Sequence, residues 1–203
     1  MEHPGGITSR NTLCVPSFAT SLLTSSSLLA SACLPTLFQA VEIAHPTTGR
    51  MEAYWDGGYT GNPALFPLYD KNLPDDIVVV NINPLVRDQV PQTHQEIANR
   101  INEISFNTSL LRELRAISFV NRLLAEGKLP EGSMKNVAVH MIADDALMND
   151  LNVATKTIPQ PVILARLKAA GAAAADHFLK KHRDSINVSG TVHLADMFSD
   201  AED

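Results

Sequence analysis

Asp75-Asp76-Ile77-Val78-Val79-Val80-Asn81-Ile82 is the stretch of this sequence that decides the fold class. A continuous run of β-branched residues is typical of a strand buried on both faces, as in a parallel sheet covered by helices. Asn136–Ile142 is predicted to form another buried strand. Between the two predicted strands, Thr93 and Glu96 have the spacing of a capping box, and the long helical pattern that they begin ends at Gly127. Strands that alternate with helices predict an α/β fold with a mainly parallel sheet.

Further elements follow from the same kind of pattern. A last helix is predicted from Pro161 to His182, and a short helix over residues 28–33 precedes a hairpin of strands 39–43 and 52–55. The apolar residues of the long helix keep an approximate 3.6-residue period, but the phase changes near Phe106-Asn107, so two helices with a bend are an alternative to one. In its first half the apolar positions are Ile97, Ile101 and Ile104.

Three segments are expected along the chain. Residues 1–27 are rich in Gly, Pro, Ser and Thr and sustain neither period, which predicts an irregular segment, non-native or disordered. Residues 28–198 form the folded part, without an internal repeat or a clear boundary, and residues 199–203 form an acidic tail. Because few strands are predicted, we expect an incomplete three-layer sandwich.

Composition narrows the class of protein. With 203 residues, 45% of them hydrophobic and 19% charged, the chain can bury a core. A net charge of -6 argues against a nucleic-acid partner, which needs a basic surface. Cys14 and Cys33 have neither the number of a disulfide framework nor the spacing of a metal site, so a reducing, cytoplasmic compartment is expected. Alternatively, the uncharged stretch 11–41 resembles a signal peptide with cleavage after Ala32, which predicts export.

Tyr54-Trp55-Asp56-Gly57-Gly58 places a carboxylate where a strand gives way to a loop. Glycines permit backbone angles that other residues avoid, so the chain can turn sharply beside a ligand. Asp56 is therefore a candidate proton acceptor. Asp-Gly pairs also occur in ordinary turns, so this motif alone does not separate the two interpretations.

Two blocks surround the carboxylate. Leu29–Pro35 has the small residues of a helix that ends in a proline, and Tyr54–Pro63 combines a strand end, the Asp-Gly-Gly turn and an Asn-Pro segment. Together these blocks resemble the second catalytic block of bacterial patatin-like phospholipases. The resemblance covers roughly residues 28–198. The downstream stretches that also fit the family are Ile77–Ile82, Asn83-Pro84 and Phe106–Leu111.

The resemblance implies the C-terminal part of a patatin-like fold and a serine acyl hydrolase with a Ser–Asp dyad. Asp56 would take the proton from the serine hydroxyl, which attacks the ester and forms an acyl-enzyme. Gly57 and Gly58 would shape the turn, and Asn62 would brace the loop. The implied substrate is a lipid or phospholipid acyl ester, with peripheral contact to a membrane surface and no cofactor or metal.

The chain departs from the family in its nucleophile. It contains no Gly-x-Ser-x-Gly elbow and no glycine-rich oxyanion loop, and no glycines flank Ser25, Ser26 and Ser27. We therefore expect the chain alone to be inactive, and the N-terminal segment favours a truncated or frame-shifted family sequence. The alternative class is a non-catalytic fragment that binds lipid or protein through an uncovered apolar face.

Other candidate residues favour structural roles. His177 and His182 lie five apart on a predicted helix, whereas a metal pair prefers a spacing of four, so a solvated helix end is expected. Asp144-Asp145 follows a strand, where a helix cap or polar turn is favoured over a site carboxylate. A Ser–His–Asp triad is compatible with the residue types, but the sequence presents no serine on an elbow.

Overall fold

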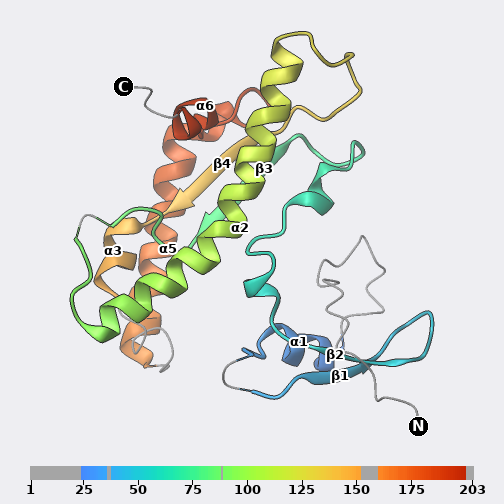
Figure 1. Ribbon diagram of the computed structural model, residues 1–203. Coiled ribbons are helices and arrows are strands. Elements are labelled where there is room, and N and C mark those ends of the chain that lie inside the picture. The colour runs from blue at the N-terminus through green and yellow to red at the C-terminus, as the bar shows by residue number, and fades with distance from the viewer. Residues whose placement is uncertain (1–23, 36–37, 88, 152–159, 200–203) are drawn as a thin grey trace. The chain divides into compact units, whose positions relative to one another are not determined.

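The computed structural model of the 203-residue chain describes residues 24–35, 38–87, 89–151 and 160–199 (Figure 1). The chain divides into two compact units, Met1–Pro67 and Leu68–Asp203. This division falls inside the segment 28–198, where the sequence shows no boundary. Of the predicted irregular segment 1–27, residues 1–23 lie outside the described residues, as do residues 200–203 of the acidic tail.

The first unit contains a short helix and a hairpin. Helix α1 spans Ser25–Ser31, three residues earlier than the sequence predicts, because the Thr24 side chain accepts a hydrogen bond from the Ser27 N–H and caps the helix. Strands β1 (Val41–Ala44) and β2 (Met51–Tyr54) pair antiparallel, which confirms the predicted hairpin. Two 3-10 turns follow β2 along the chain: η2 (Gly57–Tyr59) and η3 (Phe66–Tyr69).

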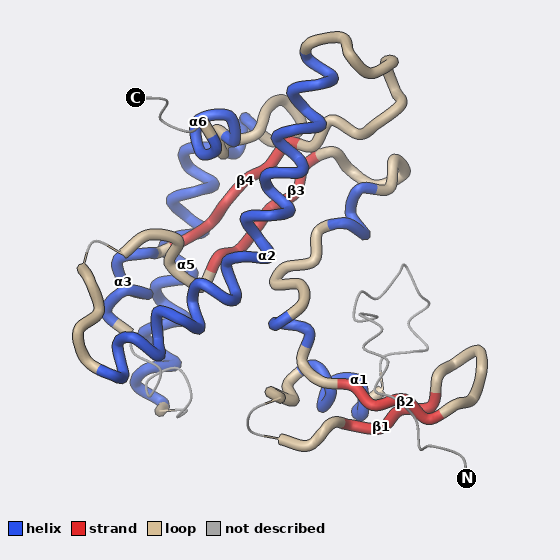
Figure 2. Tube along the Cα trace, viewed as in Figure 1, coloured by secondary structure: helices blue, strands red, loops and turns tan. Residues whose placement is uncertain are grey.

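The second unit is built on a parallel pair of strands. Strands β3 (Asp76–Asn81) and β4 (Ala138–Ala143) pair in register from Asp76↔Ala138 to Asn81↔Ala143. Figure 1 shows the long helix α2 crossing in front of this pair and α5 behind it. Figure 2 shows how much of the described chain is helical and how little is strand. The described residues thus form a mixed α/β structure with a parallel pair, as the two predicted buried strands imply.

Helix α2 spans His94–Ala125. Its capping box is complete: the Thr93 side chain accepts from the Glu96 N–H, and the Glu96 carboxylate accepts from the N–H groups of Gln92 and Thr93. Past its end, Gly127 adopts a φ of +66°, the left-handed conformation of a glycine after a helix. The predicted limits of this helix are therefore confirmed by local hydrogen bonds.

The apolar pattern of α2 changes phase because polar residues occupy positions in the core. Glu103 and Asn107 are both buried, and the Asn107 amide donates to the Pro84 carbonyl at 2.8 Å. The helix continues through this point as one 32-residue element. Its buried apolar residues are Leu110, Leu114 and Ile117. The apolar stripe expected in its first half is exposed instead, at Ile97, Ile101 and Ile104.

The remaining elements complete the second unit. Helix α5 spans Pro161–His182, the range that the sequence predicts. The 3-10 turn η4 (Arg183–Ser185) follows it, and the short helices α3 (Asp145–Asp150) and α6 (Leu194–Phe198) were not expected. Each short helix has fewer than two turns, so neither carries a detectable apolar period.

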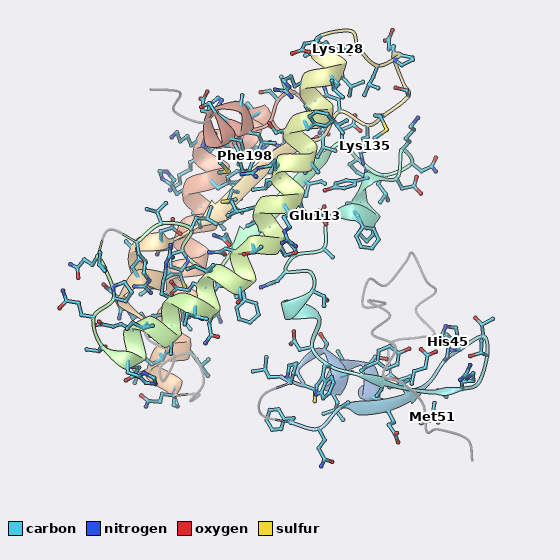
Figure 3. All side chains as sticks on the ribbon, in the orientation of Figure 1. His45, Met51, Glu113, Lys128, Lys135 and Phe198 are labelled. Atoms are coloured by element: carbon cyan, nitrogen blue, oxygen red, sulfur yellow. The ribbon has the colours of Figure 1, made fainter. Side chains whose placement is uncertain are left out.

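Side chains fasten the start of the second unit to its core. The Tyr69 hydroxyl donates to Glu113 at 2.6 Å, and burial together with this acceptor raises the pKa of Tyr69. The buried Lys135 ammonium donates to the carbonyls of Leu68 and Asp70 at 2.9 and 3.2 Å. Figure 3 labels Glu113 on α2 and Lys135 on the chain before β4. Two separate parts of the unit therefore hold this segment.

One expectation about the sheet is wrong. The sequence predicts that β3 is buried on both faces, but only Ile77 and Val79 are buried, whereas Val78 and Val80 are 46% and 67% exposed. Helix α5 covers the corresponding face of β4, where its Phe178 meets the ring of His140. The β-branched run correctly indicates a strand. It cannot show whether a helix covers the second face of β3, and α5 leaves that face uncovered.

Candidate functional site

Asp56 lies at the carboxyl end of β2 and is held from two sides. Its Oδ1 accepts a hydrogen bond from the Gly58 N–H at 2.6 Å and so caps the η2 turn. Its own N–H donates to the Cys33 carbonyl at 2.8 Å. The hairpin delivers the carboxylate to the end of a strand, as the sequence predicts, and these two contacts fix its direction.

The turn after Asp56 differs from the expectation. Gly57 and Gly58 form a right-handed 3-10 turn, and neither has the positive φ that the Asp-Gly-Gly motif suggests. The Gly57 carbonyl closes the turn by accepting from the N–H groups of Thr60 and Gly61 at 2.9 and 2.8 Å. The compact loop at the two glycines therefore does not depend on left-handed backbone angles.

The carboxylate of Asp56 retains accepting capacity. It is half-buried, and the residues that the structure describes make no ion pair with it. One oxygen is held by the Gly58 N–H, and an ionised carboxylate offers further lone pairs. Asp56 can therefore accept a proton from a hydroxyl placed beside it.

The neighbours of Asp56 tie the hairpin to the chain after α1. The Trp55 indole N–H donates to the Phe38 carbonyl at 3.0 Å, and the buried thiol of Cys33 donates to the Gln39 carbonyl at 2.9 Å. Asn62 precedes Pro63 through a cis peptide bond. Its predicted role as a brace of the loop stays a prediction.

The serines considered as nucleophiles lie in a regular element. Ser25, Ser26 and Ser27 form the first turn of α1, behind the cap that Thr24 provides. A nucleophile elbow places its serine on a sharp turn between a strand and a helix. These three serines do not have that placement, so none of them is presented as a nucleophile elbow.

A buried histidine cluster in the second unit was missed by the sequence analysis. His140 is fully buried in β4; its Nε2 lies 2.7 Å from Asp76 Oδ1, and its Nδ1 lies 3.2 Å from the Thr191 hydroxyl. Asp76 also accepts from the Asn187 N–H at 3.0 Å. Burial works to raise the pKa of Asp76, but the hydrogen bonds from His140 and Asn187 outweigh it and lower that pKa.

The order hydroxyl, imidazole, carboxylate is that of a hydrolase triad, but burial argues for a structural role. A substrate cannot reach an imidazole that has no exposed surface. Instead, the cluster joins β3 and β4 to the segment 187–191. A sequence cannot reveal it, because Asp76 and Thr191 meet His140 only through the parallel register and the return of the chain after α5.

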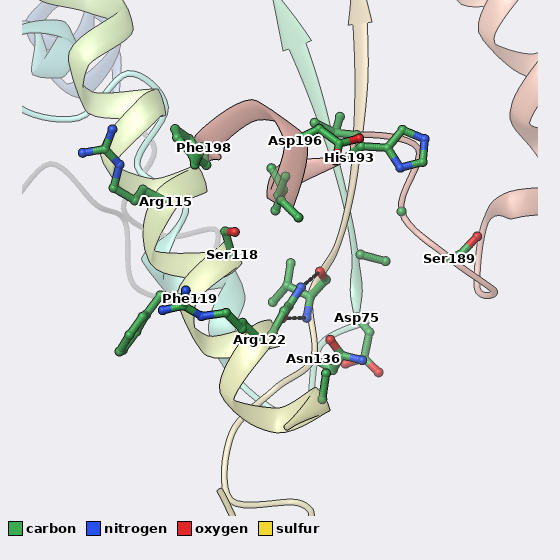
Figure 4. Close-up of a pocket in the computed structure, with 18 of the residues that line it drawn as sticks. Asp75, Arg115, Ser118, Phe119, Arg122, Asn136, Ser189, His193, Asp196 and Phe198 are labelled. Carbon is green, nitrogen blue, oxygen red and sulfur yellow. Dashed lines mark hydrogen bonds between the residues drawn. The ribbon is translucent and has the colours of Figure 1, made fainter. Parts of the chain in front are cut away.

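A cavity of about 1250 Å³ lies in the second unit, and no sequence pattern predicts it. It is bounded by the C-terminal half of α2, the first residues of β3, the chain that enters β4, and the segment 187–199 (Figure 4). Its walls come from parts of the chain that are far apart in sequence. Only the tertiary structure brings them together.

The other candidates have structural explanations. The Asp144 side chain accepts from the Leu147 N–H at 3.0 Å and caps α3, which confirms its expected role. Burial and the neighbouring Asp144 raise the pKa of Asp145.

His177 and His182 lie on α5, where desolvation and then Lys181 and His177 lower the pKa of His182. Within the described part of the chain, no group of three His, Cys, Asp or Glu side chains could hold a metal ion.

Comparisons with known proteins give no relative. No protein-family model, curated protein or solved structure matches this chain. Among the helices of the described residues, none combines the length and the apolar character needed to cross a bilayer.

Proposed function

We propose that this chain carries the aspartate half of a Ser–Asp centre that hydrolyses acyl esters of lipids, within a fold of the patatin-like type. Asp56 is the general base of this centre. It takes the proton from a serine hydroxyl, the serine attacks the ester carbonyl, and water then hydrolyses the acyl-enzyme. The reaction needs no cofactor, and the substrate reaches the centre from a membrane surface that the protein contacts peripherally.

The observation that carries the proposal is the fixed carboxylate at the end of the hairpin. Gly58 and Cys33 hold the side chain and the backbone of Asp56 through separate hydrogen bonds. A base must be oriented before substrate binds, because misplacement lowers the rate of proton transfer. The carboxylate caps its own turn through one oxygen and has further lone pairs for a hydroxyl proton, which supports the role of a base.

The architecture of the second unit supports the same proposal in a coarser way. A parallel pair with α2 on one side and α5 over β4 on the other resembles the unit from which three-layer α/β sandwiches are built (Figure 1). We propose an incomplete sandwich of this type. The thiol of Cys33, which is not in a disulfide, fits a cytoplasmic location.

A split-enzyme experiment tests the role of Asp56. The purified chain is mixed with a fragment of a patatin-like enzyme that supplies the glycine-rich loop and the Gly-x-Ser-x-Gly elbow but ends before that enzyme's own aspartate. Hydrolysis of a p-nitrophenyl acyl ester is expected from the mixture and not from either part. Asp56→Asn is expected to lower the rate by about a hundredfold or more, the contribution of a general base.

Asp184→Asn is the matched control, because Asp184 is an exposed aspartate on η4. It should leave the rate of the mixture unchanged. Equal rates for the unmodified and Asp56→Asn mixtures would contradict the proposal. Turnover by the chain alone that is lost in Asp56→Asn would support the site and overturn the expected inactivity.

A second candidate function is protein binding through β3. Val78, Val80 and Ile82 are 46%, 67% and 61% exposed on and just after this strand. Among the described residues, β3 pairs only with β4, so its other edge offers unpaired backbone groups. Exposed apolar strand edges are surfaces to which another strand adds.

Sedimentation of the purified chain tests this second candidate. The unmodified chain is expected to self-associate as its concentration rises, and Val80→Lys to shift it to the monomer, because a charge on an edge strand opposes pairing. Val162→Lys on α5 is the control, since Val162 is 77% exposed but lies on a helix. A monomeric unmodified chain, or equal effects of the two variants, would exclude self-association through β3.

A further inference from the structure

The cavity of the second unit has a polar wall on α2. Arg115, Ser118, Phe119 and Arg122 line it at spacings of three, four and seven residues, which make them neighbours on the helix surface. Figure 4 shows Ser118 on the side of α2 toward the strands, and Arg115 and Phe119 projecting from the other side of the helix. A helix face that served only to pack would carry apolar residues at such positions.

Neither arginine of this wall forms a salt bridge among the described residues, although Lys128 and, to a smaller extent, the charge of Arg122 lower the pKa of Glu126. The Arg115 guanidinium lies 5.1 Å from the centre of the Phe198 ring, and that of Arg122 lies 5.5 Å from the Phe119 ring. The carboxylate nearest in sequence to Arg122, Glu126, is paired with Lys128 at 2.6 Å. Two guanidinium groups, each beside an aromatic ring, therefore keep donors for an anionic group.

The opposite wall carries carboxylates. Figure 4 shows Asp75 beside the strands and Asp196 beside His193, across the cavity from α2. No ion pair to Asp75 or Asp196 is present within the described ranges, whereas Asp76 is held by His140. Positive and negative side chains thus line the same cavity with no ion pair between them in the described ranges, which leaves room for a ligand of both charges.

The third wall is fixed before any ligand binds. A Cβ on Gly190 would lie 3.0 Å from the backbone N and O of Val139, so the chain approaches β4 as closely as a glycine allows. The N–H groups of Thr191 and Val192 both donate to the Val139 carbonyl, at 2.9 and 3.1 Å. Asn187 adopts a φ of +64° and donates to Asp76. The wall is therefore preorganised.

We propose that this cavity binds a small organic zwitterion, with its phosphate or carboxylate group against Arg115 and Arg122 and its ammonium group against Asp75 and Asp196. The site is separate from Asp56 and does not depend on the proposed hydrolase function. A volume of about 1250 Å³ suits an organic molecule rather than a bare inorganic ion. Such a ligand can be a free metabolite or the head group of a lipid, since both carry the same charges.

Calorimetric titration of the full chain with O-phosphoethanolamine tests the site. Arg115→Gln and Arg122→Gln are each expected to weaken binding about tenfold, which corresponds to the loss of one charge-assisted hydrogen bond. Arg112→Gln is the matched control, because Arg112 is an exposed arginine of α2 that does not line the cavity. It removes the same charge and should leave the affinity unchanged. Melting temperatures verify that all three variants fold.

Two further experiments test whether the ligand must carry both charges and whether it is a free metabolite or a lipid head group. Inorganic phosphate and ethanolamine, titrated separately, should each bind about tenfold or more weakly than O-phosphoethanolamine, and Asp196→Asn should reduce this difference. If the ligand is a lipid head group, the chain will co-sediment with vesicles that contain phosphatidylethanolamine, and this co-sedimentation will depend on Arg115. Absence of binding, equal affinity for inorganic phosphate, or equal effects of Arg115→Gln and Arg112→Gln overturn the proposal. Asp56→Asn should not change the affinity for O-phosphoethanolamine. A failure of this proposal can therefore be distinguished from a failure of the proposed hydrolase function.

Discussion

Replacing His140 by alanine is expected to lower the free energy of unfolding by about 3–5 kcal/mol. The substitution leaves the carboxylate of Asp76, whose side chain is 9% exposed, without its imidazole partner 2.7 Å away. It also opens a void beside Phe178, whose ring meets that of His140 edge-on at 5.9 Å. Urea denaturation followed by circular dichroism measures the loss, because most of the helix lies in the same unit.

His177→Ala is the matched control for this substitution. His177 is exposed on α5, the helix that supplies Phe178, and its removal should change the free energy of unfolding by no more than about 0.5 kcal/mol. If His140→Ala were as mild as His177→Ala, the cluster of His140, Asp76 and Thr191 would not stabilise the unit.

The lowered pKa of Asp76 adds a pH dependence with a definite sign. Because this pKa is lower in the folded state than in the unfolded chain, the folded state binds the proton more weakly. The stabilisation is complete above the ordinary aspartate pKa of about 4 and is lost as the pH falls through the lowered value. The stability difference between the unmodified chain and Asp76→Asn should therefore shrink below about pH 4. A constant difference would contradict this linkage.

Glu103→Gln is expected to cost about 3 kcal/mol in the free energy of unfolding. The side chain of Glu103 is 4% exposed, and its two oxygens accept from Arg87 at 2.6 and 2.7 Å. The hydrogen bond to this carboxylate raises the pKa of Arg87. Arginine is protonated even without such a partner, so the guanidinium stays charged when the carboxylate is removed. Because the Arg87 side chain is 22% exposed and can still be hydrated, we expect the lower end of the range for a broken buried pair.

Glu126→Gln provides the matched comparison, measured by the same denaturation. Glu126 pairs with Lys128 at 2.6 Å, a separation equal to that of the buried pair, but the two side chains are 41% and 65% exposed. Surface pairs contribute between about 0 and 1 kcal/mol. A cost for Glu126→Gln that equals that of Glu103→Gln would mean that burial does not set the strength of these pairs.

Local patterns predicted the elements that local interactions stabilise. Thr93 and Glu96 mark the start of α2 because both halves of the capping box lie within one turn of helix. The β-branched run at Ile77 and the hairpin that leads to Asp56 were likewise visible in the sequence, with ends correct to within about two residues. The position of the candidate base at a strand end followed from these elements.

Features that depend on distant contacts were not predictable. Charged and amide side chains such as Glu103 and Asn107 are mostly exposed in proteins, but here they lie in the core, where Arg87 and the Pro84 carbonyl bind them. The right-handed turn at Gly57 was not predicted, because glycine adopts right-handed and left-handed backbone conformations about equally well. The cavity and the cluster around His140 require the register of β3 with β4, which no single segment encodes.

The parallel register also sets the order of events during folding. Pairing Asp76 with Ala138 closes a loop of about 60 residues, whereas the β1–β2 hairpin closes over a short turn. Hairpins form in roughly 1–10 μs and helices in about 1 μs or less, but long loops delay strand pairing. Helix α2, which occupies about half of that loop, can form first and shorten the search. We therefore expect the hairpin and α2 to be structured before the two central strands meet.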